Sequence, residues 1–151
     1  MPTSKTVAFA ADHRGFPLKE LLVAKARELG HQVIDLGTSS EDRCDSIDYA
    51  IKMARAFSGD APPALGVLIC GTGNGIAMVA NRYASIIAAV VHDATTARMA
   101  REHNNANVMA LGAHIIGKEV AFDCLETFLN TEFLGGRYAV RETRLRGLGG
   151  L

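Results

Sequence analysis

The sequence has no excess charge of either sign and no long apolar segment. Lys and Arg together number 16, as do Asp and Glu, so the formal net charge is +0 at pH 7. A surface without a positive excess does not favour nucleic acid or an anionic membrane as a partner, and any recognition of anions must be local. No apolar run approaches the roughly 20 residues that a transmembrane helix needs. We therefore expect neither a nucleic-acid partner nor a membrane partner.

Cysteine is also scarce, with only Cys44, Cys70 and Cys124 in the chain. The number is odd, and the spacings match neither a C-x-x-C pair nor a set of zinc ligands. We therefore expect free thiols, no metal and no cofactor. The N-terminal segment lacks the features of a signal peptide, which together with the free thiols predicts a cytoplasmic protein. The apolar surroundings of Cys124 are typical of an inert core cysteine.

The order of segments along the chain predicts an α/β fold. Short apolar runs, typical of buried strands, alternate with segments in which apolar residues recur with the period of a helix. A length of 151 residues suits a single domain covering 1–151. The predicted strands are 6–11, 32–36, 65–70, 86–91 and 107–111, and the predicted helices are 17–29, 47–57, 76–82, 93–102 and 120–129. This alternation predicts a mostly parallel, doubly wound five-stranded sheet, which binds ligands beyond the carboxyl ends of its strands.

Chemically unusual residues follow the first predicted strand. Asp12, His13 and Arg14 place a carboxylate, an imidazole and a guanidinium in succession, and these groups can supply a base, an acid and an anion-binding site. A solvated turn in which Asp12 caps the following helix is an equally open interpretation.

A glycine-rich loop, Gly71–Gly75, follows the third predicted strand. Three glycines in five residues let the backbone N–H groups approach a ligand closely. The spacing matches neither a dinucleotide-binding fingerprint nor a P-loop. Cys70 comes just before this loop, where the N-terminus of the next helix would favour a thiolate able to act as base or nucleophile. A base beside several donors suits an enediolate intermediate, and a Cys–His hydrolase is the alternative.

Two more polar clusters occur in the second half of the chain. His103 and Asn104 lie where a predicted helix ends, so His103 could equally be a helix C-cap. Arg137 and Arg141 are four residues apart, so on a helix they would share a face suited to binding a phosphate. A solvated basic face is the alternative for these arginines.

Four motifs, taken in order, resemble the type B ribose-5-phosphate isomerases and their galactose-6-phosphate and allose-6-phosphate isomerase relatives. They are D-H-x-G-F-x-L-K at 12–19, L-I-C-G-T-G-x-G at 68–75, E-H-N-N-A-N-V at 102–108 and G-G-R-x-x-x-R at 135–141. The resemblance runs from residue 7 to about residue 144. It implies a Rossmann-like three-layer sandwich and a metal-free aldose–ketose isomerase that interconverts D-ribose 5-phosphate and D-ribulose 5-phosphate.

The resemblance also implies a role for each residue of the motifs. Cys70 is the base that moves the proton through an enediolate, and His103 is the proton donor that opens the sugar ring, with Asp12 and Thr72 as further catalytic residues. A homodimer with shared active sites is implied, with His103, Asn104, Arg137 and Arg141 reaching each site from the partner chain, and assembly into a tetramer is left open. The implied substrate-binding residues are Asp12, His13, Gly71, Thr72, Gly73, Asn74, Gly75, Asn104, His114, Arg137 and Arg141.

The sequence departs from the family pattern at four positions. Ser46 stands where the family often has tyrosine, Tyr138 where it has histidine, and His114 and Ile87 stand in place of arginines. These departures leave the length of the sugar open. The alternatives are an isomerase of allose 6-phosphate or galactose 6-phosphate, or a phosphosugar-binding module without catalysis. The Gly-Gly-Leu end of the chain is expected to be disordered.

Overall fold

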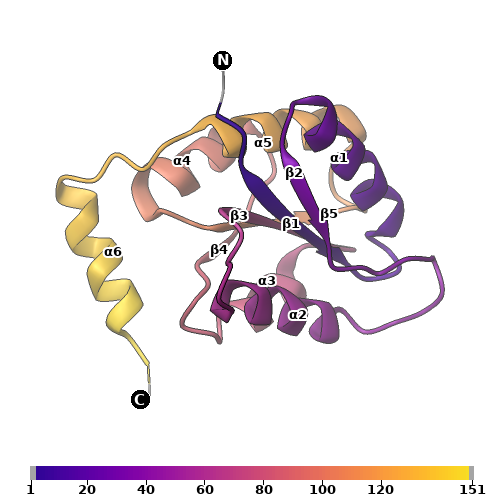
Figure 1. Cartoon of the computed structure of the whole chain (residues 1–151), viewed down its shortest axis with the longest axis horizontal. Coiled ribbons are helices and arrows are strands. Elements are labelled where there is room, and N and C mark those ends of the chain that lie inside the picture. Colours follow the sequence, from indigo (N-terminus) through magenta and orange to yellow (C-terminus); the bar gives the residue numbers. More distant parts are fainter. Residues whose placement is uncertain (1–2, 150–151) are drawn as a thin grey trace.

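The chain folds around one sheet of five parallel strands, with helices between them (Figure 1). The structure is a computed structural model and describes residues 3–149, so most of the tail expected to be disordered lies outside the described residues. The strand order is β2-β1-β3-β5-β4, and every neighbouring pair is parallel. The elements are β1 Thr6–Ala11, α1 Phe16–Glu28, β2 Gln32–Asp35, α2 Ser46–Ser58, β3 Leu65–Cys70, α3 Asn74–Ala80, β4 Ala88–Val90, α4 Ala94–Asn104, β5 Val108–Gly112, α5 Lys118–Asn130 and α6 Arg137–Gly147.

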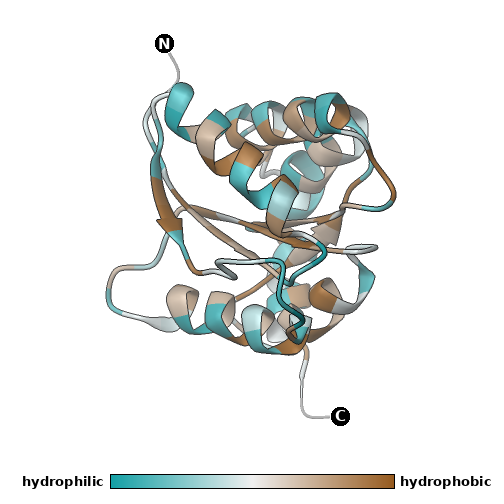
Figure 2. Ribbon diagram, turned by 90° about the vertical axis from the view of Figure 1, so that its right-hand side faces the viewer, coloured by the Kyte–Doolittle hydropathy of each residue, from teal (hydrophilic) through white to brown (hydrophobic). Residues whose placement is uncertain are grey.

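Helices cover both faces of the sheet, which confirms the predicted three-layer α/β architecture (Figure 2). One core cluster joins the sheet to α1, α4 and α5 through residues such as Leu22, Ala97 and Leu125. A second cluster joins the other face to α2 and α3 through Met53 and Ile76. Since both faces are buried, the central strands β1 and β3 are apolar after Thr6 at the start of β1, as their sequences predicted.

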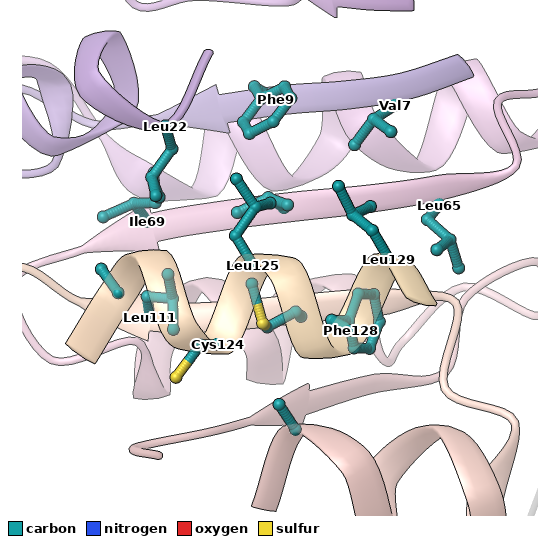
Figure 3. Close-up of a cluster of buried hydrophobic side chains, with 14 of the residues drawn as sticks. Val7, Phe9, Leu22, Leu65, Ile69, Leu111, Cys124, Leu125, Phe128 and Leu129 are labelled. Atoms are coloured by element: carbon teal, nitrogen blue, oxygen red, sulfur yellow. The ribbon is translucent and has the colours of Figure 1, made fainter. Parts of the chain in front are cut away.

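The core under α5 contains Cys124, as its apolar surroundings predicted (Figure 3). The side chain is fully buried beside residues such as Leu111 and Phe128. Burial raises the pKa of the Cys124 thiol to about 11, so this cysteine is a packing residue and not a nucleophile.

The predicted boundaries differ most at the edge strand β4. The apolar run predicted a strand over 86–91, but β4 contains only Ala88–Val90. The strand begins late because a side chain from the next crossover closes the turn before it: the N–H of Ile87 donates to Oδ1 of Asn107 at 2.9 Å. The helix predicted over 76–82 begins earlier, at Asn74, directly within the glycine-rich loop.

Because all strands are parallel, they begin on one side of the sheet and end on the other. We call the side where the strands end the carboxyl edge and the side where they begin the amino edge. At the carboxyl edge, Cys70 pairs with Gly112, and at the amino edge Gly66 pairs with Val108. Because α4 runs back across the sheet, its last residue, Asn104, lies at the amino edge. Helix α6 also starts beyond that edge and stands beside α4, away from the two helical layers (Figure 1). Among residues 3–149, no helix is long and apolar enough to cross a membrane.

Candidate active site

The carboxyl edge brings together three loops that carry predicted site residues. Asp12 follows β1 and donates its N–H to the carbonyl of Ile69 in β3 at 3.2 Å. His114 follows β5 and donates its N–H to the carbonyl of Gly71 at 3.0 Å. The loops after β1, β3 and β5 are therefore held side by side, as expected for the binding edge of a parallel sheet.

Cys70 ends β3 with its side chain almost fully buried, at 6% exposure. The N–H of Gly73 donates to Sγ of Cys70 at 3.1 Å, and a donor aimed at sulfur stabilises negative charge there. Gly73 has a φ of +83°, and a Cβ at this position would lie 3.0 Å from the carbonyl carbon of Leu111. Only glycine therefore allows the tight turn that directs this amide at the thiol.

Three residues of the glycine-rich loop, Thr72, Asn74 and Gly75, are open to solvent, while Gly71 is buried. Thr72 is exposed, and its Oγ1 accepts the N–H of Asn74 at 3.2 Å. Gly75 lies in the first turn of α3, where the N–H groups have no carbonyl partner within the helix. The loop can thus present donors to an oxygen anion beside Cys70.

Asp12 is buried at 7% exposure and closes the turn after β1. Its Oδ1 accepts the N–H groups of Arg14 and Gly15, each at 3.0 Å. The capping interpretation was wrong in one respect: the residue before α1 is Gly15, and no side chain caps that helix. Asp12 instead shapes the loop, while Oδ2 takes no part in these bonds.

His13 is held by a loop that sequence reasoning did not connect to it. Nδ1 of His13 lies 3.2 Å from both the backbone nitrogen and the carbonyl oxygen of Cys44, so it can accept from the N–H or donate to the carbonyl. Cys44 lies 31 residues further along the chain, in the segment between β2 and α2. The contact uses the backbone of Cys44, so no side-chain pattern in the sequence could have indicated it.

A cavity of about 580 Å³ opens beside these loops. Its lining includes the side chains of His13 and His114 together with Leu18 and Leu21 of α1. Ser46 stands where the family often has tyrosine, and the nearest tyrosine after it is Tyr49. Tyr49 lines a separate hollow with Cys44 and Lys52.

The amino edge gathers the remaining predicted residues. The ring of His103, at the end of α4, stacks on the ring of Tyr138 with centroids 4.5 Å apart and planes 15° apart. Nη2 of Arg137 donates to the hydroxyl oxygen of Tyr138 at 3.0 Å. Arg141 lies one turn further along α6, and Asn104 is exposed next to His103.

A buried arginine ties α6 to the end of α4. Arg101 donates to Oδ1 of Asn105 at 3.0 Å, and Nδ2 of Asn105 donates to Oε1 of Glu142 at 3.0 Å. Hydrogen bonds from Arg146 and Asn105 lower the pKa of Glu142, so its carboxylate form is favoured. Asn105, with a φ of +49°, is the C-cap of α4, so the interpretation of His103 as the C-cap was wrong.

The two groups of residues lie at opposite edges of the sheet within one chain. Four residue steps separate the two ends of β5, which corresponds to roughly 13 Å along the strand. The structure therefore does not bring His103, Asn104, Arg137 or Arg141 to the Cys70 of the same chain. No cluster of three or more His, Cys, Asp or Glu side chains that could hold a metal occurs within residues 3–149.

Comparisons with known proteins agree on one family. The family model described as Ribose/Galactose Isomerase matches residues 7–145. Ribose-5-phosphate isomerase B of Escherichia coli K12 is 42% identical over 137 residues, which cover 91% of each chain. The crystal structure of a ribose 5-phosphate isomerase from Thermotoga maritima is 40% identical with a TM-score of 0.92, covering 97% of this chain and 100% of that one.

A eukaryotic structure is similar as well. The type B ribose 5-phosphate isomerase of Trypanosoma brucei is 38% identical with a TM-score of 0.89, covering 95% of this chain and 98% of that one. The family match at residues 7–145 includes residues at both edges of the sheet and most of α6. The chain belongs to the ribose/galactose isomerase family and is an enzyme of the isomerase class.

Proposed function

We propose that this isomerase interconverts D-ribose 5-phosphate and D-ribulose 5-phosphate by moving a proton between C1 and C2. The observation that carries the proposal is the buried Cys70 thiol with the N–H of Gly73 directed at its sulfur, beside an open loop of backbone donors. The names of the relatives supply the substrate. We also propose that residues 1–151 form one domain acting in the cytoplasm, where its free cysteines stay reduced.

In the proposed reaction, the thiolate of Cys70 removes the proton from C2 of the open-chain aldose. The electron pair of the C–H bond forms the C1–C2 double bond of an enediolate, and the negative charge moves to the oxygen on C1. Backbone donors of Gly71–Gly75 stabilise that oxygen, because preorganised N–H groups favour charge that develops in the transition state. The C2 hydroxyl passes its proton to the oxygen on C1, and Cys70 returns the carbon-bound proton to C1 as the carbonyl forms at C2.

The ring of the cyclic sugar opens before this step. We assign His103 as the group that protonates the ring oxygen, with Asp12 receiving the hydroxyl proton. The free Oδ2 of Asp12 at the carboxyl edge supports this assignment. Thr72 binds the sugar hydroxyls nearest Cys70, and Asn104 binds those nearest His103.

The phosphate of the substrate is assigned to His13, His114, Arg137 and Arg141. Support comes from His13 and His114, which line one cavity, and from Arg137 and Arg141, which are exposed on α6. The guanidinium groups can bind phosphate oxygens bidentately.

A complete site then requires two chains, because its residues lie at opposite edges of the sheet. We propose a homodimer in which the amino edge of one chain faces the carboxyl edge of its partner. Helix α6 supports this arrangement: no residue of it is buried, and Val140 is 65% exposed and Leu145 43% exposed. Apolar side chains of this size are expected to be covered in the assembly.

The deciding experiment measures conversion of ribose 5-phosphate by the purified protein with EDTA present. Cys70→Ala should lower kcat by about 10²–10⁴-fold, the usual contribution of a positioned general base. Cys44→Ala is the matched control, because Cys44 contacts His13 only through backbone atoms. Circular dichroism checks that both variants fold.

No conversion by folded wild type would refute the pentose assignment. Allose 6-phosphate and galactose 6-phosphate are then tested in the same assay. Binding of these sugars without any turnover would favour the non-catalytic module. Turnover that survives in Cys70→Ala would remove the cysteine from the mechanism.

A further inference from the structure

Arg14, a candidate anion-binding group from its place after β1, lies beside the glycine-rich loop and has no role in the proposed function. A Cβ placed on Gly71 would lie 3.2 Å from Cδ of Arg14 and 3.5 Å from its Nη1. The same point lies 3.5 Å from Nδ1 of His114. The guanidinium of Arg14 and the imidazole of His114 therefore approach Gly71 together, directly after the proposed base Cys70.

The backbone of Arg14 is firmly placed. Its N–H is bound by Oδ1 of Asp12, and the next residue, Gly15, is so close to β3 that a Cβ would lie 2.4 Å from the carbonyl oxygen of Ile69. The stem of Arg14 thus leaves the chain from a fixed position. Its guanidinium can reach a ligand without a change in the loop.

Arg14 also lines the cavity beside His13, and the lining carries more positive than negative groups. Its charged groups are Arg14 and Lys118, against the carboxylate of Glu41. Neither Arg14 nor Lys118 forms an ion pair with any residue of the described range 3–149. Since the chain has a formal net charge of +0, this excess is local to the cavity.

We propose that Arg14 binds the phosphate group of the substrate and extends the active site from Gly71 into this cavity. The inference rests on the proposed function for the identity of the sugar, but not for the binding of a phosphate dianion. Arginine suits this role because its guanidinium stays protonated and offers paired N–H donors to two phosphate oxygens. His114 contributes a single ring nitrogen at the same place, so Arg14 supplies the permanent positive charge.

The test compares Arg14→Ala and Arg14→Lys with Arg27→Ala. Arg27 is the matched control, since it is an exposed arginine near the end of α1, whereas Arg14 lies in the loop before that helix begins. Steady-state kinetics with ribose 5-phosphate should show KM raised about 10-fold or more in Arg14→Ala with kcat nearly unchanged, as for a group that binds ground and transition states equally. Arg14→Lys should recover part of the loss, and Arg27→Ala should match wild type.

A second measurement does not depend on turnover. Inorganic phosphate should slow alkylation of Cys70 by iodoacetamide, and Arg14→Ala should raise the phosphate concentration needed by about 10-fold. Alkylation is followed by mass spectrometry of the Cys70 peptide. The unliganded rate should be the same in both proteins, which shows that the loop is intact.

The outcomes separate this inference from the proposed function. If wild type converts ribose 5-phosphate and Arg14→Ala has the same KM, the inference is wrong and the function stands. If wild type converts no pentose phosphate but Arg14→Ala weakens phosphate protection, the inference stands and the function is wrong. The role of Arg14 is also overturned if phosphate does not protect Cys70 of the wild type from alkylation. The same holds if phosphate protects Cys70 equally well in Arg14→Ala.

Discussion

Among single residues, Tyr138 connects two groups that the proposed reaction uses separately. Its ring stacks on His103, and its hydroxyl oxygen accepts from Arg137, whose guanidinium also lies 5.0 Å from the centre of the tyrosine ring. The stack orients the imidazole, while the hydrogen bond orients the guanidinium. A histidine at position 138 could not make both contacts in the same way, because it has no hydroxyl group.

Two substitutions separate these contacts. Tyr138→Phe keeps the stack and loses only the bond from Arg137, so we expect KM to rise about 2–5-fold with kcat unchanged. Tyr138→Leu also removes the stacked ring, so kcat should fall by about 3–10-fold, in line with the energy of an aromatic pair. Kinetics are combined with NMR of the His103 ring protons, which should lose their ring-current shift in Tyr138→Leu alone. Equal kinetics for the two variants would refute the positioning role of the ring.

At the level of elements, the turn between α1 and β2 contains a buried histidine. Nδ1 of His31 accepts the N–H of Lys5, just before β1, at 3.1 Å. Burial, followed by the nearby charge of Lys5, lowers the pKa of His31 below its ordinary value of 6.5. The fold therefore favours the neutral imidazole, and protonation of His31 opposes the packing of this turn.

The sign of the pH effect follows from this direction. The unfolded chain takes up a proton at His31 more readily than the folded chain, so the free energy of unfolding should fall as the pH drops below about 6.5. His31→Gln should flatten that decline between about pH 7 and pH 5.5, as measured by urea unfolding at each pH. His92→Gln is the control, since His92 is exposed. An unchanged slope in His31→Gln would show that other groups cause the pH dependence.

At the scale of the whole molecule, the two groups of site residues lie at opposite edges of the sheet, and this position determines how many chains a complete active site needs. The carboxyl edge holds Cys70 and the amino edge holds His103. In a symmetric dimer, each site would combine the carboxyl edge of one chain with the amino edge of the other. This arrangement can be tested with mixed dimers purified through two different affinity tags.

A mixed dimer of Cys70→Ala and His103→Ala chains should regain activity. One of its two sites combines the intact Cys70 with the intact His103, so about half of the wild-type activity is expected. A mixed dimer of wild type with the double variant carries the same two substitutions on one chain and should be inactive, because each site has one defect. If each site lay within a single chain, the dimer of the two single variants would be inactive, and the dimer of wild type with the double variant would keep about half of the activity.

How far the sequence alone could predict this protein differs between its parts. Strands β1 and β3 have the predicted bounds, because apolar runs buried on both faces are a strong local signal. The starts of β4 and α3 were misplaced, since the hydrogen bond between Ile87 and Asn107 and the glycine turn override the apolar pattern there. The contact of Cys44 with His13 uses backbone atoms, so no residue pattern encodes it.

The sequence by itself determined the alternation of strands and helices, the burial of Cys124 and the family, because these depend on hydrophobic period and on short motifs. Only the tertiary structure decided that Arg14 faces Gly71 and that His103 lies at the far edge from Cys70. The physical reason is the parallel sheet: its right-handed crossovers place residues distant in sequence at the same edge, and the two ends of one helix at opposite edges.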